Sequence, residues 1–153
     1  MQPFKLERKL FIPIDIDTVW KFFSDPHNLE KITPKDMKFD VVHCPDVDEI
    51  YKGMLIEYRV SPLLNIPLKW VTLIKEVNTL RNFTDTQKTG PYSLWEHTHT
   101  FEKKDNGTLM TDKVLYKLPF GPFGILAYSV FVKKKLERIF DYREKIIKDI
   151  FHF

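Results

Sequence analysis

Cysteine and glycine are scarce in this chain. Its single cysteine, Cys44, permits no internal disulfide and leaves multi-cysteine metal motifs without ligands. A lone thiol fits a reducing compartment, and the opening MQPFKLERKLFIPI carries charges where a signal peptide needs an unbroken apolar stretch, so we expect a cytoplasmic protein. The 5 glycines form no phosphate loop, dinucleotide fingerprint or Gly-x-Ser-x-Gly elbow. Nucleotide chemistry and nucleophilic hydrolysis therefore lack their usual residues.

Long apolar runs and an excess of one charge are missing as well. No stretch approaches the ~20 apolar residues of a membrane span, so we expect no such span. The 24 basic and 21 acidic residues, which give a net charge of +3, are mixed along the chain. The only basic run, at 133–135, is followed by Glu137 and Asp141, which is typical of a solvated helix face. Without a one-sided basic stripe, nucleic acid is not expected as a partner.

Aromatic side chains are plentiful by contrast. The 13 Phe, 6 Tyr and 3 Trp make up 14% of a chain of 153 residues, which is the length of one ordinary domain. One compact core needs fewer large flat side chains, so some of them are expected to line a cavity. We expect residues 1–153 to form a single domain.

The apolar pattern begins as a strand and continues as two short helices. Apolar residues keep a period of two over residues 4–12, interrupted only by Arg8. Asp17 is expected to cap a short helix, and Asp25 with Pro26 to form the N-cap and first turn of a second one.

The middle of the chain is rich in β-branched and aromatic residues separated by turn residues. Six strands are expected, near 38–42, 51–60, 67–77, 81–88, 92–103 and 108–117. Asp105-Asn106-Gly107 is a strong hairpin signal between the last two. Short turns between successive strands predict an antiparallel meander.

The last part of the chain has a helical period. After a turn at 121–124 there is no further proline or glycine, which predicts a helix of over twenty residues. Its apolar positions recur mostly at three- and four-residue spacing, so one stripe faces the sheet: Val132, Leu136, Ile139, Phe140, Ile147 and Ile150. These elements together predict an α+β fold whose helices are segregated from the sheet.

Several segments resemble a known superfamily. They are VWKFF with Asp25-Pro26 (19–26), Ile32-Thr33-Pro34, FTDTQ with Gly90-Pro91-Tyr92 (83–92), WEHTHTF (95–101) and IFDYR (139–143). Over almost its whole length the chain resembles the START-like superfamily, also called SRPBCC, and most of all its bacterial ligand-binding members. The resemblance implies a helix-grip fold, in which a curved antiparallel sheet of about seven strands wraps around a long C-terminal helix and leaves a pocket for a hydrophobic ligand. It implies no reaction, because the superfamily supports both binding and catalysis.

The candidate interior faces of three strands mix apolar with polar side chains. Alternate residues share a face, which groups Trp95 with His97, His99 and Phe101, groups Phe83 with Asp85 and Gln87, and groups Met110 with Asp112, Val114 and Tyr116. Buried polar groups need partners. Arg143 falls on the sheet-facing stripe of the helix, and we expect it to pair with Asp85 or Asp112, or with an anionic group on a ligand.

These faces favour binding of a small hydrophobic, aromatic or amphipathic molecule in a cavity between sheet and helix. The expected ligand-binding residues are Tyr58, Trp70, Phe83, Asp85, Gln87, Trp95, His97, His99, Asp112, Tyr116 and Arg143. Further candidates for the apolar wall are Met54, Ile56, Ile74 and Phe120.

Catalysis is the main alternative to binding. An acid–base enzyme of the polyketide cyclase or dehydratase type would use His97 or His99 together with Asp112 or Asp85. The same residues also fit a purely structural network that fixes the helix to the sheet. The residue pattern leaves both open, and we favour binding over catalysis.

A metal site and a protein-interaction role are the remaining alternatives. Two histidines with a carboxylate form a common ligand set for zinc or iron. Spacing alone is weak evidence, and the resembled superfamily is not a metal family, so we expect no metal and no cofactor. An interaction module would use its surface, and exposed Phe151 and Phe153 at the C-terminus would hint at a homodimer instead of a monomer.

Overall fold

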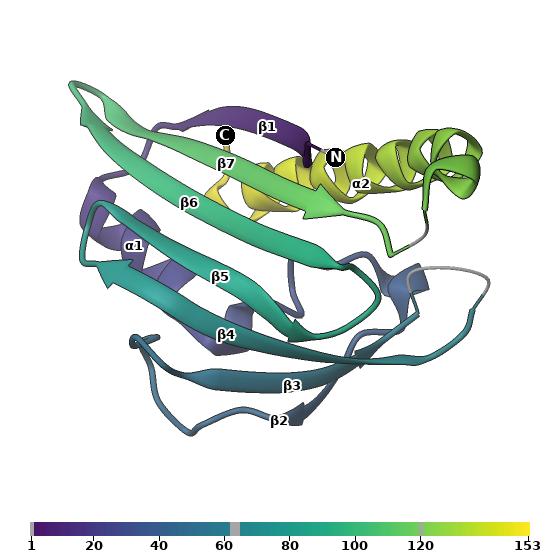
Figure 1. Cartoon of the computed structure of the whole chain (residues 1–153). Helices are drawn as coiled ribbons and strands as arrows, with labels where there is room; N and C mark the ends of the chain where they lie inside the picture. Colours follow the sequence, from purple (N-terminus) through teal and green to yellow (C-terminus); the bar gives the residue numbers. More distant parts are fainter. Residues whose placement is uncertain (1, 62–64, 120) are drawn as a thin grey trace.

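Seven strands form one antiparallel sheet in the computed structural model, which describes residues 2–61, 65–119 and 121–153. The strands are β1 (Phe4–Ile12), β2 (Asp40–His43), β3 (Leu55–Val60), β4 (Leu68–Asn78), β5 (Asn82–Thr89), β6 (Leu94–Lys104) and β7 (Gly107–Lys117). Their order in the sheet is β1-β7-β6-β5-β4-β3-β2 (Figure 1). The predicted α+β class and the meander of successive strands are confirmed, and β1 completes the sheet by pairing with β7.

The strand predicted at 51–60 is shorter than expected. It begins at Leu55, because the residues before it form a turn in which the Met54 amide donates to the Tyr51 carbonyl. Gly53 supplies the turn with a φ of 90°, a conformation that other residues rarely adopt. Arg8 does not interrupt β1, since its side chain continues the same face and forms an ion pair of 3.2 Å with Asp141.

The first helix, α1 (Ile16–Ser24), is capped by Asp15 and not by Asp17 as predicted. An Asp15 carboxylate oxygen accepts the Thr18 backbone N–H at 2.9 Å, a bond that only the residue just before the helix can make. The second short helix is confirmed as a 3-10 turn, η1 (Pro26–Asn28), with Asp25 as its N-cap. A further 3-10 turn, η2 (Lys35–Met37), leads into β2.

The C-terminal helix, α2 (Pro122–Phe151), spans 30 residues. The expected turn at 121–124 is in fact its first turn, since Pro122 occupies the helix start, where its missing N–H costs nothing. The helix ends at Phe151, and its C-cap, His152, has a left-handed φ of 60°. None of the helices in the described ranges is at once long and apolar enough to cross a bilayer.

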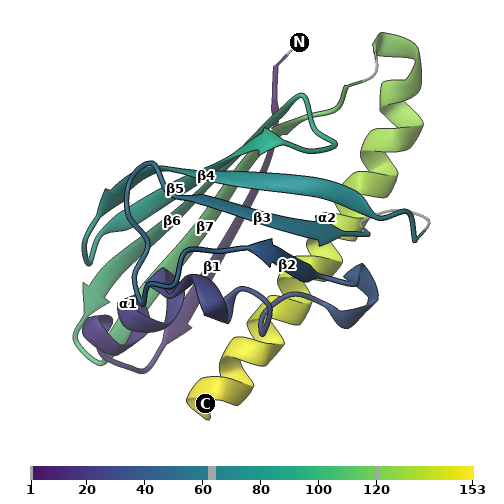
Figure 2. The same ribbon diagram turned by 90° about the horizontal axis from the view of Figure 1, so that it is seen from below.

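Both helices pack on the same face of the sheet (Figure 2). Trp20 of α1 contacts Phe83 and Phe101 edge to face, with ring centroids 6.0 and 5.5 Å apart. Phe140 of α2 meets His97 on that face, at 5.6 Å. The apolar stripe of α2 lies where it was predicted. Its buried members are Val132, Leu136, Phe140 and Ile147, while Ile139 and Ile150 are partly buried.

Candidate functional site

A cavity of about 180 Å³ lies between the sheet and α2. Its walls come from β3 to β6, from the segment around η1 and η2, and from one face of α2. Most wall residues are aromatic or aliphatic, among them Phe39, Ile56, Val60, Ile74, Leu136 and Ile139. Alternation along the strands explains this, because every second residue of a strand points to the covered face.

An aromatic group forms one part of the wall. Tyr58 stacks on Trp70 with ring planes 12° apart, and Trp95 meets Trp70 edge to face at 5.3 Å. Thr72 forms hydrogen bonds with two of these side chains. Its Oγ1 lies 3.1 Å from the Tyr58 hydroxyl and accepts the Trp70 indole N–H at 3.2 Å. Burial raises the pKa of Tyr58, against the Thr72 hydrogen bond. The group therefore offers the cavity flat apolar faces, and Thr72 already engages the Tyr58 hydroxyl and the Trp70 indole N–H.

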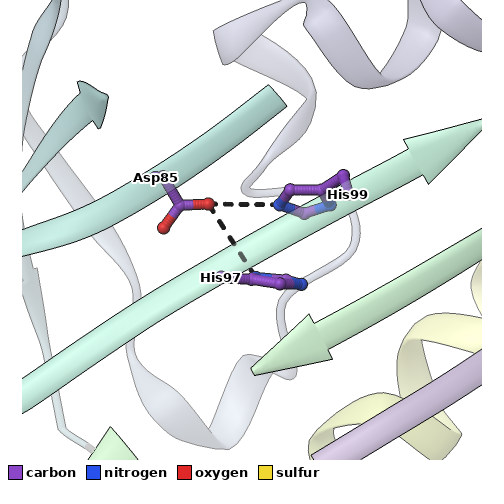
Figure 3. Close-up of side chains that lie close together, drawn as sticks. All are labelled: Asp85, His97 and His99. Carbon is purple, nitrogen blue, oxygen red and sulfur yellow. Dashed lines mark hydrogen bonds and ion pairs between the residues drawn. The ribbon is translucent and has the colours of Figure 1, made fainter. Parts of the chain in front are cut away.

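A cluster of two histidines and two carboxylates forms the polar part. Asp85 on β5 is directly opposite His97 on β6, and His99 is directly opposite Asp112 on β7. One Asp85 oxygen, Oδ2, lies 3.1 Å from His99 Nε2 and 3.8 Å from His97 Nδ1 (Figure 3). Asp112 Oδ1 lies 2.7 Å from His97 Nε2 and 2.9 Å from His99 Nδ1, although the latter contact is not aligned as a hydrogen bond. Each imidazole is thus held between two carboxylates.

The cluster shifts the pKa values of its two histidines in opposite directions. Burial lowers the pKa of His97, helped by the neighbouring His99, and favours its neutral form. Burial also opposes the charge on His99, but its contacts with Asp112 and Asp85 outweigh this and raise its pKa. For Asp112, burial favours the neutral acid, and the two histidines overcome it and lower its pKa. His99 is therefore the first of the two histidines to gain a proton.

Arg143 enters the same region from α2, as predicted, with 8% of its surface exposed. Its Nη1 lies 4.0 Å from Asp112 Oδ1, a loose ion pair without a hydrogen bond. Its Nε and Nη1 are buried without a hydrogen-bond partner, and the guanidinium lies 5.0 Å from the centre of the Phe140 ring. The expected pairing with Asp112 is therefore made at long range only, and no pairing with Asp85 is seen in the described residues.

Eight of the eleven expected ligand-binding residues line the cavity: Tyr58, Trp70, Phe83, Asp85, Trp95, His97, His99 and Arg143. Asp112 lies behind the histidines, while Tyr116 packs on Phe4, with ring centroids 5.5 Å apart. Gln87 is the clearest departure. At the end of β5 its amide donates to the Tyr92 carbonyl at 2.7 Å and accepts the Tyr92 N–H at 3.1 Å, so it closes the β5–β6 turn.

The remaining wall candidates divide in the same way. Ile56 and Ile74 line the cavity, whereas Met54 belongs to the closed core with 1% exposure. Phe120 lies outside the described residues.

Many cavity residues were missed from the sequence, and Tyr92, Thr72 and Lys135 are three of them. Tyr92 contacts Trp95 at 4.8 Å, but in the strand expected at 92–103 alternation placed it on the face opposite Trp95, whereas β6 begins only at Leu94. Thr72 was detectable, because it shares a strand face with Trp70 and Ile74. Lys135 belongs to the run interpreted as solvated, yet it borders the cavity and forms a 3.3 Å ion pair with Asp36.

Solved structures of other proteins share the fold of this chain. No family model matches the chain, and no curated protein matches it significantly in sequence. The solved structure of the KanY protein (ms6282) is 15% identical, covers 100% of both chains and has a TM-score of 0.71. Protein Ms6760 from Mycobacterium smegmatis is 16% identical over 95% of this chain and 89% of its own, with a TM-score of 0.68. Ara h 8.0201 is 14% identical over 96% of this chain and 99% of its own, with a TM-score of 0.63.

These identities are too low to transfer an activity, but the coverage is nearly complete. The sheet order, the short helices after β1 and the long terminal helix agree with the resemblance seen in the sequence. The chain has the fold of these solved structures, the helix-grip fold that its resemblance to the START-like superfamily implied.

Proposed function

We propose that this protein binds a small, largely apolar molecule in the cavity between the sheet and α2. The observation that carries the proposal is a space of about 180 Å³ whose walls are mostly aromatic and aliphatic. An apolar protein cavity of roughly 150 Å³ is known to hold benzene, so this space suits a ligand built around one small ring or a short alkyl chain. Burial of its apolar surface would supply the affinity.

The two parts of the wall suggest how such a ligand lies. Trp70 and Trp95 would face its flat or aliphatic part, since their indoles border the cavity. Asp85 is the most exposed member of the polar cluster, with 17% of its side chain accessible, and would accept a hydrogen bond from a hydroxyl or amine. An amphipathic ring compound therefore fits better than a pure hydrocarbon.

Tryptophan fluorescence tests the proposal directly. Trp70 and Trp95 line the cavity, whereas Trp20 contacts the core at Phe83 and Phe101. Compounds that raise the melting temperature in a screen of small-ring and short-chain molecules should also change the emission of the wild-type protein. A Trp70→Phe/Trp95→Phe variant should lose that change while keeping its fold. If no apolar or amphipathic compound raises the melting temperature or alters the emission, the proposal is wrong.

The same experiment addresses the two alternatives. A bound compound recovered unchanged by mass spectrometry after long incubation argues for binding, and a changed mass argues for catalysis. The interaction module has less support, because Phe151 is partly buried against Phe22, with ring centroids 5.4 Å apart, and of the two terminal phenylalanines Phe153 alone is largely exposed, at 41%.

A further inference from the structure

We propose that Asp85, His97 and His99 bind one divalent transition-metal ion, and that Asp112 is the outer carboxylate that orients both histidines. The site goes beyond the proposed ligand binding and does not depend on it. Its three ligand atoms all lie within 4.8 Å of one another. The spacing of two histidines on one strand was weak evidence, and the folded arrangement adds the position of both carboxylates.

The inner ligands converge on one point. His97 Nδ1 and His99 Nε2 both face the same Asp85 oxygen, at 3.8 and 3.1 Å (Figure 3). A zinc ion bound at about 2.0–2.2 Å by such groups has ligands about 3.4 Å apart. Ring rotations that move the ligand atoms by about 1 Å would therefore bring them to this spacing. The pairing of β5 with β6 keeps Asp85 opposite His97.

Asp112 would act as a carboxylate behind the metal ligands, facing the second ring nitrogen of each histidine. Histidines that bind metals usually present their second ring nitrogen to a carboxylate, which fixes the ring and raises its basicity. Here the second nitrogens, His97 Nε2 and His99 Nδ1, lie 2.7 and 2.9 Å from one Asp112 oxygen, and of the two contacts the one with His97 is aligned as a hydrogen bond. Asp85 forms the aligned hydrogen bond to His99, as Asp112 does to His97. Asp85 also borders the cavity, so its carboxylate and the ring nitrogens that face it are placed where an ion could enter.

Charge and donor type indicate the kind of ion. The carboxylates of Asp85 and Asp112 balance the two positive charges of a dication. Arg143, 4.0 Å from Asp112, adds one positive charge, which an anion or a hydroxide on the cavity side would balance. Two imidazoles and one carboxylate, without sulfur, suit zinc, iron(II), cobalt or nickel and not calcium or magnesium. Because both histidines and Asp85 line the cavity, the free coordination positions would point to the proposed ligand.

Metal titration without any organic ligand tests the inference. Protein freed of metal by a chelator should bind one zinc ion in calorimetry with a dissociation constant of about 1 μM or below. Cobalt(II) should give visible absorption bands of a nitrogen- and oxygen-ligated site. Asp85→Asn should lose the site, and Asp112→Asn should weaken zinc binding by about 10–100-fold because it removes only the outer support.

A surface pair provides the matched control. His27 Nδ1 lies 2.9 Å from Asp25 in a half-exposed setting, so His27→Gln should leave zinc binding unchanged. Circular dichroism checks the fold of each variant. If Asp112→Asn does not fold, Asp85→Asn decides, since that side chain reaches the cavity. Wild-type protein without zinc binding at 100 μM, or equal binding by Asp85→Asn, overturns the inference, and neither result bears on binding of an organic molecule by the metal-free protein.

Discussion

Asp112 and Arg143 face each other, but they differ in what they contribute to stability. Asp112 is 3% exposed and compensates His99 and the arginine, so Asp112→Asn should lower the free energy of unfolding by about 3–5 kcal/mol. Arg143→Met should lower it by only about 1–2 kcal/mol, because it also removes two buried nitrogen atoms, Nε and Nη1, that lack hydrogen-bond partners. Urea denaturation measures both. Equal losses would show that the guanidinium is hydrogen-bonded in solution.

Two cavity tyrosines make stability depend on alkaline pH. Burial raises the pKa of Tyr58, with a weaker opposing hydrogen bond from Thr72, and burial likewise raises the pKa of Tyr92. In the unfolded chain both ionise near pH 10. The contribution of these two hydroxyls to the free energy of unfolding is therefore complete below about pH 10. It is lost as the pH rises further, because the unfolded state releases these protons before the folded state does.

The tyrosinate absorbance at 295 nm checks this prediction. In the folded protein part of the signal should appear only with unfolding, whereas in urea all 6 tyrosines should titrate together. A single folded-state transition near pH 10 that includes every tyrosine would contradict the burial of these hydroxyls.

At the scale of the element, the hairpin between β6 and β7 depends on a close backbone contact. A Cβ added at Gly107 would collide with the Ile12 carbonyl oxygen and lie 2.8 Å from the Pro13 Cα. Backbone atoms cannot rotate away, so Gly107→Ala should cost more than about 1 kcal/mol in urea denaturation. Gly121→Ala is the control, because a Cβ there meets nothing within 4 Å. Similar stability of the two variants would show that the β1–β7 end is looser than described.

The elements themselves were largely predictable, and their errors have local causes. Alternation located all seven strands, since the sheet is covered on one face only. The cap of α1 was misassigned because Asp15 and Asp17 both suit a helix start, and only the position of the Thr18 N–H distinguishes them. Gln87 was placed on the interior face by alternation, but at a strand end its amide reaches the turn instead.

The polar cluster was predictable as a face but not as a geometry. Alternation places His97 and His99 on one side of β6. Which carboxylate meets which ring nitrogen depends on the register of β5 and β7 against β6, which no single strand encodes. The 4.0 Å distance from Arg143 to Asp112 depends further on how α2 lies over the sheet.

At the scale of the whole molecule, function depends on the space that α2 leaves above the sheet. Ile139 on α2 borders that space and packs against two buried apolar clusters, one that includes Val114 and Leu136 and one formed by Met37, Val60 and Trp70. Ile139→Trp should place its indole in the cavity, so the free energy of unfolding should change by no more than about 1 kcal/mol while ligand binding is lost. Val130→Trp is the control, because Val130 lies on the same helix with 49% exposure and should not affect binding.

Isothermal calorimetry with a compound from the screen measures the ligand affinity of Ile139→Trp and Val130→Trp. Urea denaturation confirms that both variants are folded. Loss of binding in Ile139→Trp alone would locate the ligand between helix and sheet. Unchanged affinity in a folded Ile139→Trp protein would place it elsewhere, since about 180 Å³ does not hold both an indole and a ring compound. A large loss of stability, above about 3 kcal/mol, would instead mean that the space is already filled by side chains, because overpacking a closed core has that effect.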